Sequence, residues 1–409
     1  MSKGPLVPPR LSIAIVMVAT LMGTALVSPL YPLFQDEWGL GPQDISTIYV
    51  VYMLGALFGL VFLGRLGDRM GYVATLSVAL ILAVLGSVMC MFAREMILLC
   101  AGRFLVGIAG TMATAAGSAG LNILTPGKER GQIALRISLL VSLGFGLGPV
   151  TGGVVGQWVQ NPLVTVHIPT LAMLVLGLML IRGLAPKGTV LAAARQLDIG
   201  DFMPRLTWPK APVAITFGLA SLLPFITFGV YGLYASMAPT IIRNVLGISG
   251  PMISGIGIAA ILTGSCLTQI AIKRIGYGRA AVIGLALVAA SNALLLVNLS
   301  LGQAWLFAVG LIVTAMGHGA TMFAGVQVVN MVSDHTNRAS LTASFWAIGY
   351  CGSIIPMMAT GMLSSLWGLN RAVSAFCVST IVLSLTVLIL FVANEAFNRK
   401  AGIKIGYSA

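Results

Sequence analysis

The chain has 409 residues, of which 58% are apolar and only 8% are charged, and its formal net charge is +13. A mean hydropathy of +1.00 exceeds what a soluble core requires and excludes an ordinary globular protein. The basic excess alone could indicate a nucleic-acid partner. However, the lysines and arginines gather between apolar stretches, so their distribution argues against nucleic-acid binding.

Apolar segments long enough to cross a bilayer recur along the whole chain. The hydrocarbon core of a membrane is about 30 Å thick and needs roughly 20 apolar residues per helix. Twelve segments meet this requirement and predict an all-α membrane protein with twelve transmembrane helices in two pseudo-symmetric six-helix bundles. The predicted spans are residues 11–34, 45–63, 74–92, 96–118, 132–156, 163–181, 211–237, 252–271, 280–299, 304–332, 340–366 and 372–393.

The basic residues alternate by side of the membrane. If the N-terminus is cytoplasmic, cytoplasmic segments and helix ends hold 19 of the 23 lysines and arginines, and Arg103 lies inside a span. This positive-inside pattern predicts that both termini are cytoplasmic. The first apolar stretch exceeds the short core of a signal peptide, so we expect it to be retained as a span.

A polar interruption divides the chain into two similar halves. We predict an N-terminal bundle over residues 1–183, a cytoplasmic linker over 184–210 and a C-terminal bundle over 211–409. Loop charges and prolines of the first half recur in the second at offsets between 205 and 209 residues: Pro32 with Pro239, Pro42 with Pro251, residues 68–71 with 273–276, and Arg130 with Arg338. A near-constant offset indicates duplicated bundles, which suits alternating access.

The loop after the second span carries glycines and charges in a compact pattern from Gly64 to Gly71. The glycines permit a tight turn, and the Asp68 carboxylate can face a helix N-terminus or Arg130. We expect a cytoplasmic conformational latch that comprises Gly64, Asp68, Arg69, Gly71 and Arg130. The alternative is that Asp68 and Arg69 are solvated loop charges. The second-half copy lacks an acid, so the latch is expected to be asymmetric.

Glycine is concentrated in two spans of the first half. Arg103 is followed by Gly107 and Gly110 in span four, and span five contains Gly144, Gly148, Pro149, Gly152 and Gly153. Glycine and proline weaken a helix in water, whereas in lipid such a run survives where a neighbouring helix packs closely against it. Span five is therefore predicted to be a tight-packing or bending helix.

Taken in order, these motifs resemble those of the major facilitator superfamily, and the twelve-span plan is similar to its drug:proton antiporter branch. The resemblance implies that Asp68 stabilises the outward-facing state, that the span-five glycines form the antiporter motif, and that spans one, four, seven and ten line a cavity. It also implies a secondary active transporter that moves small amphipathic molecules out of the cell by rocker-switch alternating access, coupled to protons.

Polar and aromatic residues at helical spacing are the candidates for substrate binding. Arg103 is a buried cation for which a functional role is favoured over snorkelling to the interface. The histidine at 318 titrates near neutral pH and could equally be a packing residue. Each serine, threonine or tyrosine could instead bridge helices or anchor an interface. The candidate substrate-binding residues are Thr24, Ser28, Tyr31, Arg103, Thr111, Thr114, Thr227, Tyr231, Tyr234, Thr314, His318, Trp346 and Tyr350.

None of the ten acidic residues is predicted to lie in the middle of a span. With Arg103 inside, this favours neutral or anionic cargo. An uptake or facilitated-diffusion carrier for such a metabolite is the alternative, and an enzyme or a pore is disfavoured. We expect no cofactor and no metal site, and a monomer in the lipid of the bacterial cytoplasmic membrane that takes small molecules, and protons as the coupling ion.

Overall fold

A computed structural model describes residues 7–127, 130–184, 197–204, 206–334 and 336–400, and no strand occurs within these ranges. The middle of the predicted linker, residues 185–196, lies outside the described residues. Twelve helical segments are long and apolar enough to cross a membrane, which confirms the predicted all-helical membrane fold. They are Pro9–Trp38, Pro42–Leu63, Tyr72–Met91, Met96–Leu124, Arg136–Trp158, Pro162–Arg182, Ala214–Leu246, Pro251–Ile272, Tyr277–Leu301, Ala304–Val332, Arg338–Trp367 and Leu369–Glu395.

Three of these spans are broken within the first half of the chain, and the breaks follow local sequence. The first consists of α1 (Pro9–Ala25), the 3-10 turn η1 (Ser28–Leu30) and α2 (Tyr31–Trp38), with a proline near the start of each of the last two. The second runs from α3 (Pro42–Phe58) into the π-helical turn η2 (Gly59–Leu63), directly before the loop helix α4 (Leu66–Met70). A π turn at this point is a feature often found beside functional residues. The sixth contains α8 (Pro162–Thr165) and α9 (His167–Arg182).

The helices form two compact units that each include a short segment from the other half of the chain. Unit 1 comprises Met1–Gly39, Val51–Pro204 and Gly250–Ala259, and unit 2 comprises Leu40–Val50, Arg205–Ser249 and Ala260–Ala409. The first part of α3 therefore belongs to unit 2, and the first part of α12 (Pro251–Ile272) belongs to unit 1. These two segments occupy matching positions in the sequence repeat.

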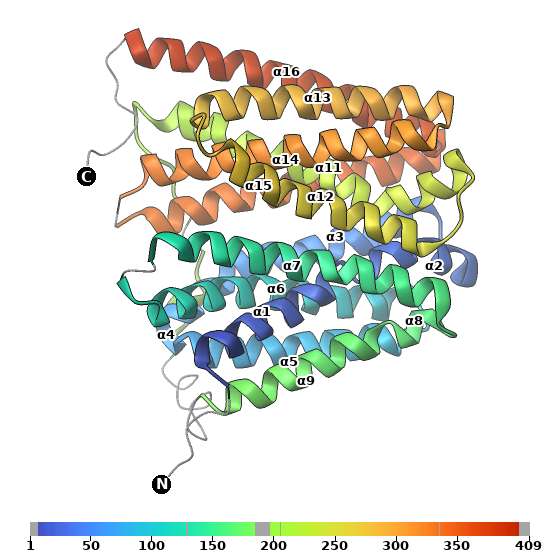
Figure 1. The fold of residues 1–409 in the computed structure, drawn as a ribbon, viewed down its shortest axis with the longest axis horizontal. Coiled ribbons are helices and arrows are strands. Elements are labelled where there is room, and N and C mark those ends of the chain that lie inside the picture. The colour runs from blue at the N-terminus through green and yellow to red at the C-terminus, as the bar shows by residue number, and fades with distance from the viewer. Residues whose placement is uncertain (1–6, 128–129, 185–196, 205, 335, 401–409) are drawn as a thin grey trace. The chain divides into compact units, whose positions relative to one another are not determined.

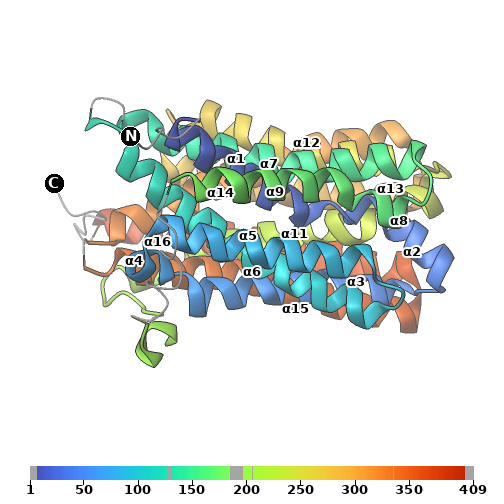
Figure 2. The same ribbon diagram turned by 90° about the horizontal axis from the view of Figure 1, so that it is seen from below.

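Within unit 1, α1 is the central helix. It contacts α5 (Tyr72–Met91), α6 (Met96–Leu124), α7 (Arg130–Trp158) and α9. Figure 2 shows α5 and α6 running beside one another, consistent with the close packing of this pair. The apolar core of the unit lies where α1, α5 and α6 meet and includes Met17, Leu80 and Met112.

The predicted tight packing of span five occurs along α1. A Cβ atom added at Gly144 would lie 2.7 Å from Cβ of Leu21, and one at Gly148 would collide with the carbonyl oxygen of Met22. A Cβ at Gly152 would likewise collide with the Leu26 carbonyl oxygen. Three glycines at intervals of four residues therefore bring two helix backbones into direct contact.

Unit 2 is built around α11 (Ala214–Leu246), which packs against α13 (Tyr277–Leu301), α14 (Ala304–Val332), α15 (Arg338–Trp367) and α16 (Leu369–Lys400) (Figure 1). A Cβ atom added at Gly229 would lie 2.8 Å from the carbonyl oxygen of Gly352, so α11 and α15 also meet through glycine. Pro224 and Pro239 lie inside α11. Neighbouring helices make such interior prolines tolerable in a membrane.

The sequence repeat has a counterpart in the backbone. Gly71 precedes α5 with φ 78° and ψ 158°, and Gly276 precedes α13 with φ 80° and ψ 157°. Positive φ strains residues with a side chain, so glycine is required at both positions. The duplicated loops thus share a backbone conformation although only the first carries an acid.

The Gly148→Ala variant tests the glycine contact between α7 and α1. Its Cβ would meet backbone atoms of α1, which cannot yield as a flexible side chain would, so we expect a loss of about 1–3 kcal/mol in stability. The measurement is the thermal unfolding midpoint of the purified protein in detergent. Gly127→Ala is the matched control, because nothing lies within 4 Å of a Cβ there. Equal midpoints for the two variants would contradict the packing argument.

Candidate functional site

Arg103 lies in the interior of unit 1, with only 1% of its surface exposed. Its Nη1 donates to the carbonyl oxygen of Thr24 at 2.5 Å, and its guanidinium carbon lies 4.3 Å from the centre of the Tyr52 ring. The side chain is thus held by α1 and α3 rather than directed to the surface of the protein. A cation over an aromatic face is stabilised electrostatically, more so where water is absent.

Two features of Arg103 leave its charge incompletely compensated. Among the described residues no carboxylate pairs with it, and its buried Nε–H has no hydrogen-bond acceptor. A buried cation without an anionic partner is expensive, which makes the position a candidate for function.

The other unit 1 candidates differ in their surroundings. Thr24, Ser28 and Tyr31 are buried, and the Thr24 hydroxyl donates to the Leu21 carbonyl at 2.5 Å. Thr111 donates to the Ile108 carbonyl at 3.0 Å, and its hydroxyl lies against Gly59 of η2. Thr114 is partly exposed and donates to the Gly110 carbonyl at 2.8 Å. The structure brings Thr24 to Arg103, whereas Thr111 occupies a helix contact.

In unit 2 the candidates gather around an aromatic side chain that the sequence patterns did not single out, Phe228 of α11. The Phe228 ring lies nearly parallel to Trp346, at 5.8 Å and 21°, and to His318, at 6.4 Å and 17°. Tyr350 meets Phe228 edge-on at 5.7 Å. We call Phe228, His318, Trp346 and Tyr350 the aromatic cluster. All but His318 are partly exposed.

Hydrogen bonds join the remaining unit 2 candidates to each other and to neighbouring helices. Nδ1 of His318 lies 2.8 Å from the Ser265 hydroxyl of α12, and the Tyr231 ring meets the His318 ring edge-on at 6.2 Å. The hydroxyls of Thr314 and Tyr234 lie 3.4 Å apart. The hydroxyl of Thr227 lies 3.2 Å from that of Thr321. These bonds satisfy buried polar groups and hold α11, α12 and α14 together.

The loop from Gly64 to Gly71 makes an ion pair that the sequence did not predict. Asp68 and Arg69 are exposed in α4, and Nε of Arg69 pairs with Oδ1 of Asp201 at 2.9 Å. Asp201 belongs to η4 (Ile199–Phe202), a turn at the end of the predicted linker. Arg130 begins α7, but its side chain lies outside the described part of the chain.

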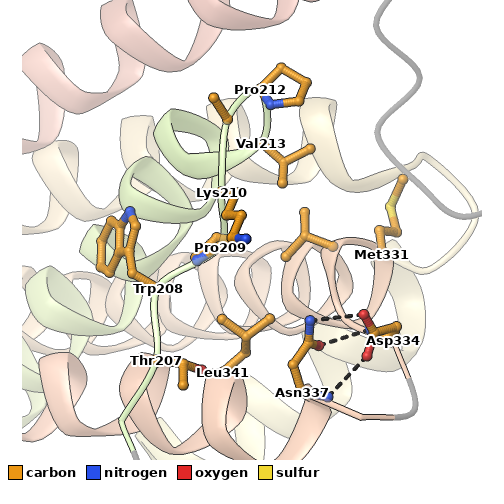
Figure 3. A pocket seen from close by; sticks show the side chains of 12 residues that line it. Thr207, Trp208, Pro209, Lys210, Pro212, Val213, Met331, Asp334, Asn337 and Leu341 are labelled. Atoms are coloured by element: carbon orange, nitrogen blue, oxygen red, sulfur yellow. Dashed lines mark hydrogen bonds between the residues drawn. The ribbon is translucent and has the colours of Figure 1, made fainter.

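A cavity of about 500 Å³ lies at one end of unit 2 (Figure 3). One wall is the segment from Thr207 to Val213, and the opposite wall is formed by the end of α14 and the start of α15. At its edge the Asp334 carboxylate accepts hydrogen bonds from Thr336 and Asn337 at 2.6 to 3.0 Å. The Asp334 carboxylate thereby stabilises the turn that precedes α15.

Sequence reasoning missed Phe228, Ser265, Tyr52 and Asp201. Phe228 stands three residues before Tyr231, so an aromatic pair on one helical face was the available signal. Ser265, Tyr52 and Asp201 matter through contacts with distant segments, for which no local pattern exists.

Comparison with known proteins gives the family. The model of the Major Facilitator Superfamily matches residues 13–279. The efflux pump radE of Floropilus chiversii is 29% identical over 190 residues, covering 44% of this chain and 34% of the pump. The putative metabolite transport protein YfiG of Bacillus subtilis is 30% identical over 171 residues, covering 39% of this chain and 36% of that protein. The chain thus spans about a third of the length of these relatives.

Solved structures of similar fold extend over nearly the whole chain. The inward-facing, occupied structure of a bacterial homolog of the human lysosomal transporter Spinster aligns with a TM-score of 0.68 and 15% identity, covering 98% of each chain. The human organic anion transporter MFSD10 aligns with a TM-score of 0.63 and 16% identity, covering 94% of this chain and all of the other. At such identity the likeness concerns the fold. With the family match over more than half of its length, the chain belongs to the Major Facilitator Superfamily, and its twelve apolar helices make it a multi-pass membrane protein.

Proposed function

We propose that this protein is a secondary active transporter that exports small, amphipathic, neutral or anionic molecules across the bacterial cytoplasmic membrane by rocker-switch alternating access. The proposal rests on the surroundings of Arg103. This cation is buried, its Nε–H is free, and it has no carboxylate partner among the described side chains. In a low-dielectric interior its positive potential attracts anions and repels cations. Because Arg103 is buried, its positive potential acts on the cargo before any direct contact. The cargo can bond to the Nε–H only if the neighbouring side chains move.

The aromatic cluster of unit 2 supports an amphipathic cargo. Phe228, Trp346 and Tyr350 are partly exposed and come from two adjacent helices, α11 and α15. Aromatic rings provide apolar contact area with few rotatable bonds, and binding pockets combine such walls with a few polar groups. Here Tyr231 and His318 are the polar groups beside the rings.

The names of similar proteins are consistent with this proposal and with its alternative. The names efflux pump and organic anion transporter are consistent with export of anionic molecules. The name putative metabolite transport protein is consistent with uptake or facilitated diffusion. We place both termini and the linker, residues 184–210, on the cytoplasmic side, between bundles at 1–183 and 211–409, and we expect a monomer. The loop latch at Gly64, Asp68, Arg69, Gly71 and Arg130 belongs to the same proposal.

A thermal-shift screen of the purified protein tests the charge of the cargo. The probes are aromatic amphiphiles in three matched groups: sulfonates, neutral analogues and permanently cationic dyes. We expect sulfonates and neutral compounds to raise the unfolding midpoint, because a ligand at 100 times its Kd adds about 2.7 kcal/mol. Arg103→Met should abolish the sulfonate response and retain the neutral one, whereas Arg103→Lys should keep part of the sulfonate response and retain the neutral one. Stabilisation by cationic dyes alone would refute the proposal.

Proton coupling is tested with proteoliposomes that contain an entrapped pH dye. A gradient of a compound found in the screen should drive a change of internal pH that vanishes when an uncoupler is added. His318→Gln should slow the pH change more than it slows compound flux, because a neutral amide cannot carry a proton. Ser265→Ala, which removes only the hydroxyl beside the ring, is the control. Compound flux without any pH change would instead support facilitated diffusion.

A further inference from the structure

His318 is held at one edge of its ring by two polar side chains of α12. Its Nδ1 lies 2.8 Å from the Ser265 hydroxyl, and the side-chain nitrogen of Gln269 donates to the same hydroxyl oxygen at 3.4 Å. We propose that Ser265 and Gln269 keep the neutral imidazole protonated on Nε2, so that His318 offers a hydrogen-bond donor to the cargo. Both are positioning residues, since they act through the imidazole. All three side chains belong to unit 2.

Close packing of α12 against α14 fixes Ser265 beside the imidazole. A Cβ atom added at Gly319 would collide with the carbonyl oxygen of Ser265, and one at Gly264 would lie 2.8 Å from Cβ of Ala315. Gly319 follows His318 directly in the chain. Because glycine lets the two backbones approach this closely, Ser265 cannot move away from the ring unless the helices separate.

The single proton of the Ser265 hydroxyl decides which nitrogen of the ring is protonated. A serine hydroxyl donates one hydrogen bond and accepts up to two. Gln269 uses the oxygen as an acceptor, so the Ser265 proton remains available for Nδ1 of His318. In the described part of the chain this proton has no carbonyl partner, whereas Thr268 donates to the Gly264 carbonyl at 2.9 Å. An Nδ1 that accepts carries no proton, and the neutral ring then carries its proton on Nε2.

The opposite tautomer would leave a buried donor without a partner. If Nδ1 carried the proton, the Ser265 oxygen would accept from both His318 and Gln269, and its own proton would have no acceptor among the described residues. Ser265 is only 2% exposed, so bulk water does not replace that acceptor. An unsatisfied buried donor is costly, which favours protonation on Nε2.

The rings around His318 leave its Nε2 available to a ligand. Phe228 lies nearly parallel to the imidazole at 6.4 Å, and Tyr231 meets it edge-on at 6.2 Å. No described residue forms a hydrogen bond with Nε2, and the ring keeps 6% of its surface exposed. A donor beside apolar rings suits an aromatic cargo that carries a hydrogen-bond acceptor, such as a carbonyl, carboxylate or sulfonate. This step rests on the proposed function, whereas the tautomer does not.

Magic-angle-spinning NMR of the full protein in lipid bilayers, with 15N- and 13C-labelled histidine, measures the tautomer at pH 8. The His318 signals are those that vanish in His318→Gln. We expect the proton on Nε2 in the parent protein. Gln269→Glu should move it to Nδ1, because an ionised carboxylate accepts the Ser265 proton and leaves the serine oxygen to accept from the ring. Ser265→Ala should give both tautomers.

Ser291→Ala is the matched control for these variants. This buried hydroxyl of unit 2 donates to the Val288 carbonyl of its own helix at 3.0 Å, so its removal should leave the His318 signals unchanged. A proton on Nδ1 in the parent protein would overturn the inference and leave the proposed export intact. A tautomer that stays the same in Gln269→Glu would do so as well.

The donor role is tested with two neutral probes of the same shape, 2-acetylnaphthalene and 2-isopropenylnaphthalene. They differ only in a carbonyl oxygen that replaces a methylene group. Equilibrium binding of the tritiated probes to the purified protein gives the two dissociation constants. The parent should bind the ketone about 2- to 12-fold more tightly, as one neutral hydrogen bond implies. Gln269→Glu should remove this preference, and Ser291→Ala should keep it.

The outcomes separate the donor role from the proposed function. Equal affinities of the parent for the two probes would overturn the donor role of His318. Binding of neither probe would refute the aromatic cluster as a cargo wall, and with it both the donor role and that part of the proposed function. Because Ser265→Ala keeps the imidazole, it changes the tautomer without removing the group that is proposed to carry protons.

Discussion

Direct contact between helix backbones is the constraint on which this structure depends. In lipid there is no water to satisfy peptide groups, so each span is helical and association relies on close packing. Glycine supplies that packing at Gly148 against α1 and at Gly229 against Gly352. It also places Arg103, because α3 and α6 approach through Gly55 and Gly107, whose Cβ atoms would collide with the facing backbone. The chemistry inside the protein is therefore positioned by residues that have no side chains.

Buried polar groups show which positions serve packing and which are available for function. Most threonine and serine hydroxyls within the spans donate to a carbonyl of their own helix, as Thr20 and Thr314 do at 2.8 Å. Such bonds satisfy the hydroxyl and require no ligand. Arg103 is different because its Nε–H stays unpaired while its charge faces the Tyr52 ring and the Thr24 carbonyl. This contrast is why one cation carries the functional proposal.

Sequence reasoning succeeded where the signal was local. Hydropathy found all twelve spans, since each must cross the same thickness of hydrocarbon, and the glycines of span five indicated a close neighbour. It could not find Phe228 at the centre of the aromatic cluster, because helical spacing gives the face of a residue but not its partner. The pairing of Arg69 with Asp201 was equally invisible. The two lie far apart in the sequence, and no local pattern indicates which of several acidic residues pairs with a loop arginine.

The exchange of short segments between the units has a consequence for biosynthesis. Unit 1 comprises Met1–Gly39, Val51–Pro204 and Gly250–Ala259, and the ribosome produces the last of these segments only after all of α11. Domains usually fold as they emerge, N-terminal first. Here unit 1 cannot complete its packing before Met252 is synthesised, because Met252 covers the surface of α7 around Gly153. Until then that surface faces lipid, so the two halves of the chain complete their folding together rather than in succession.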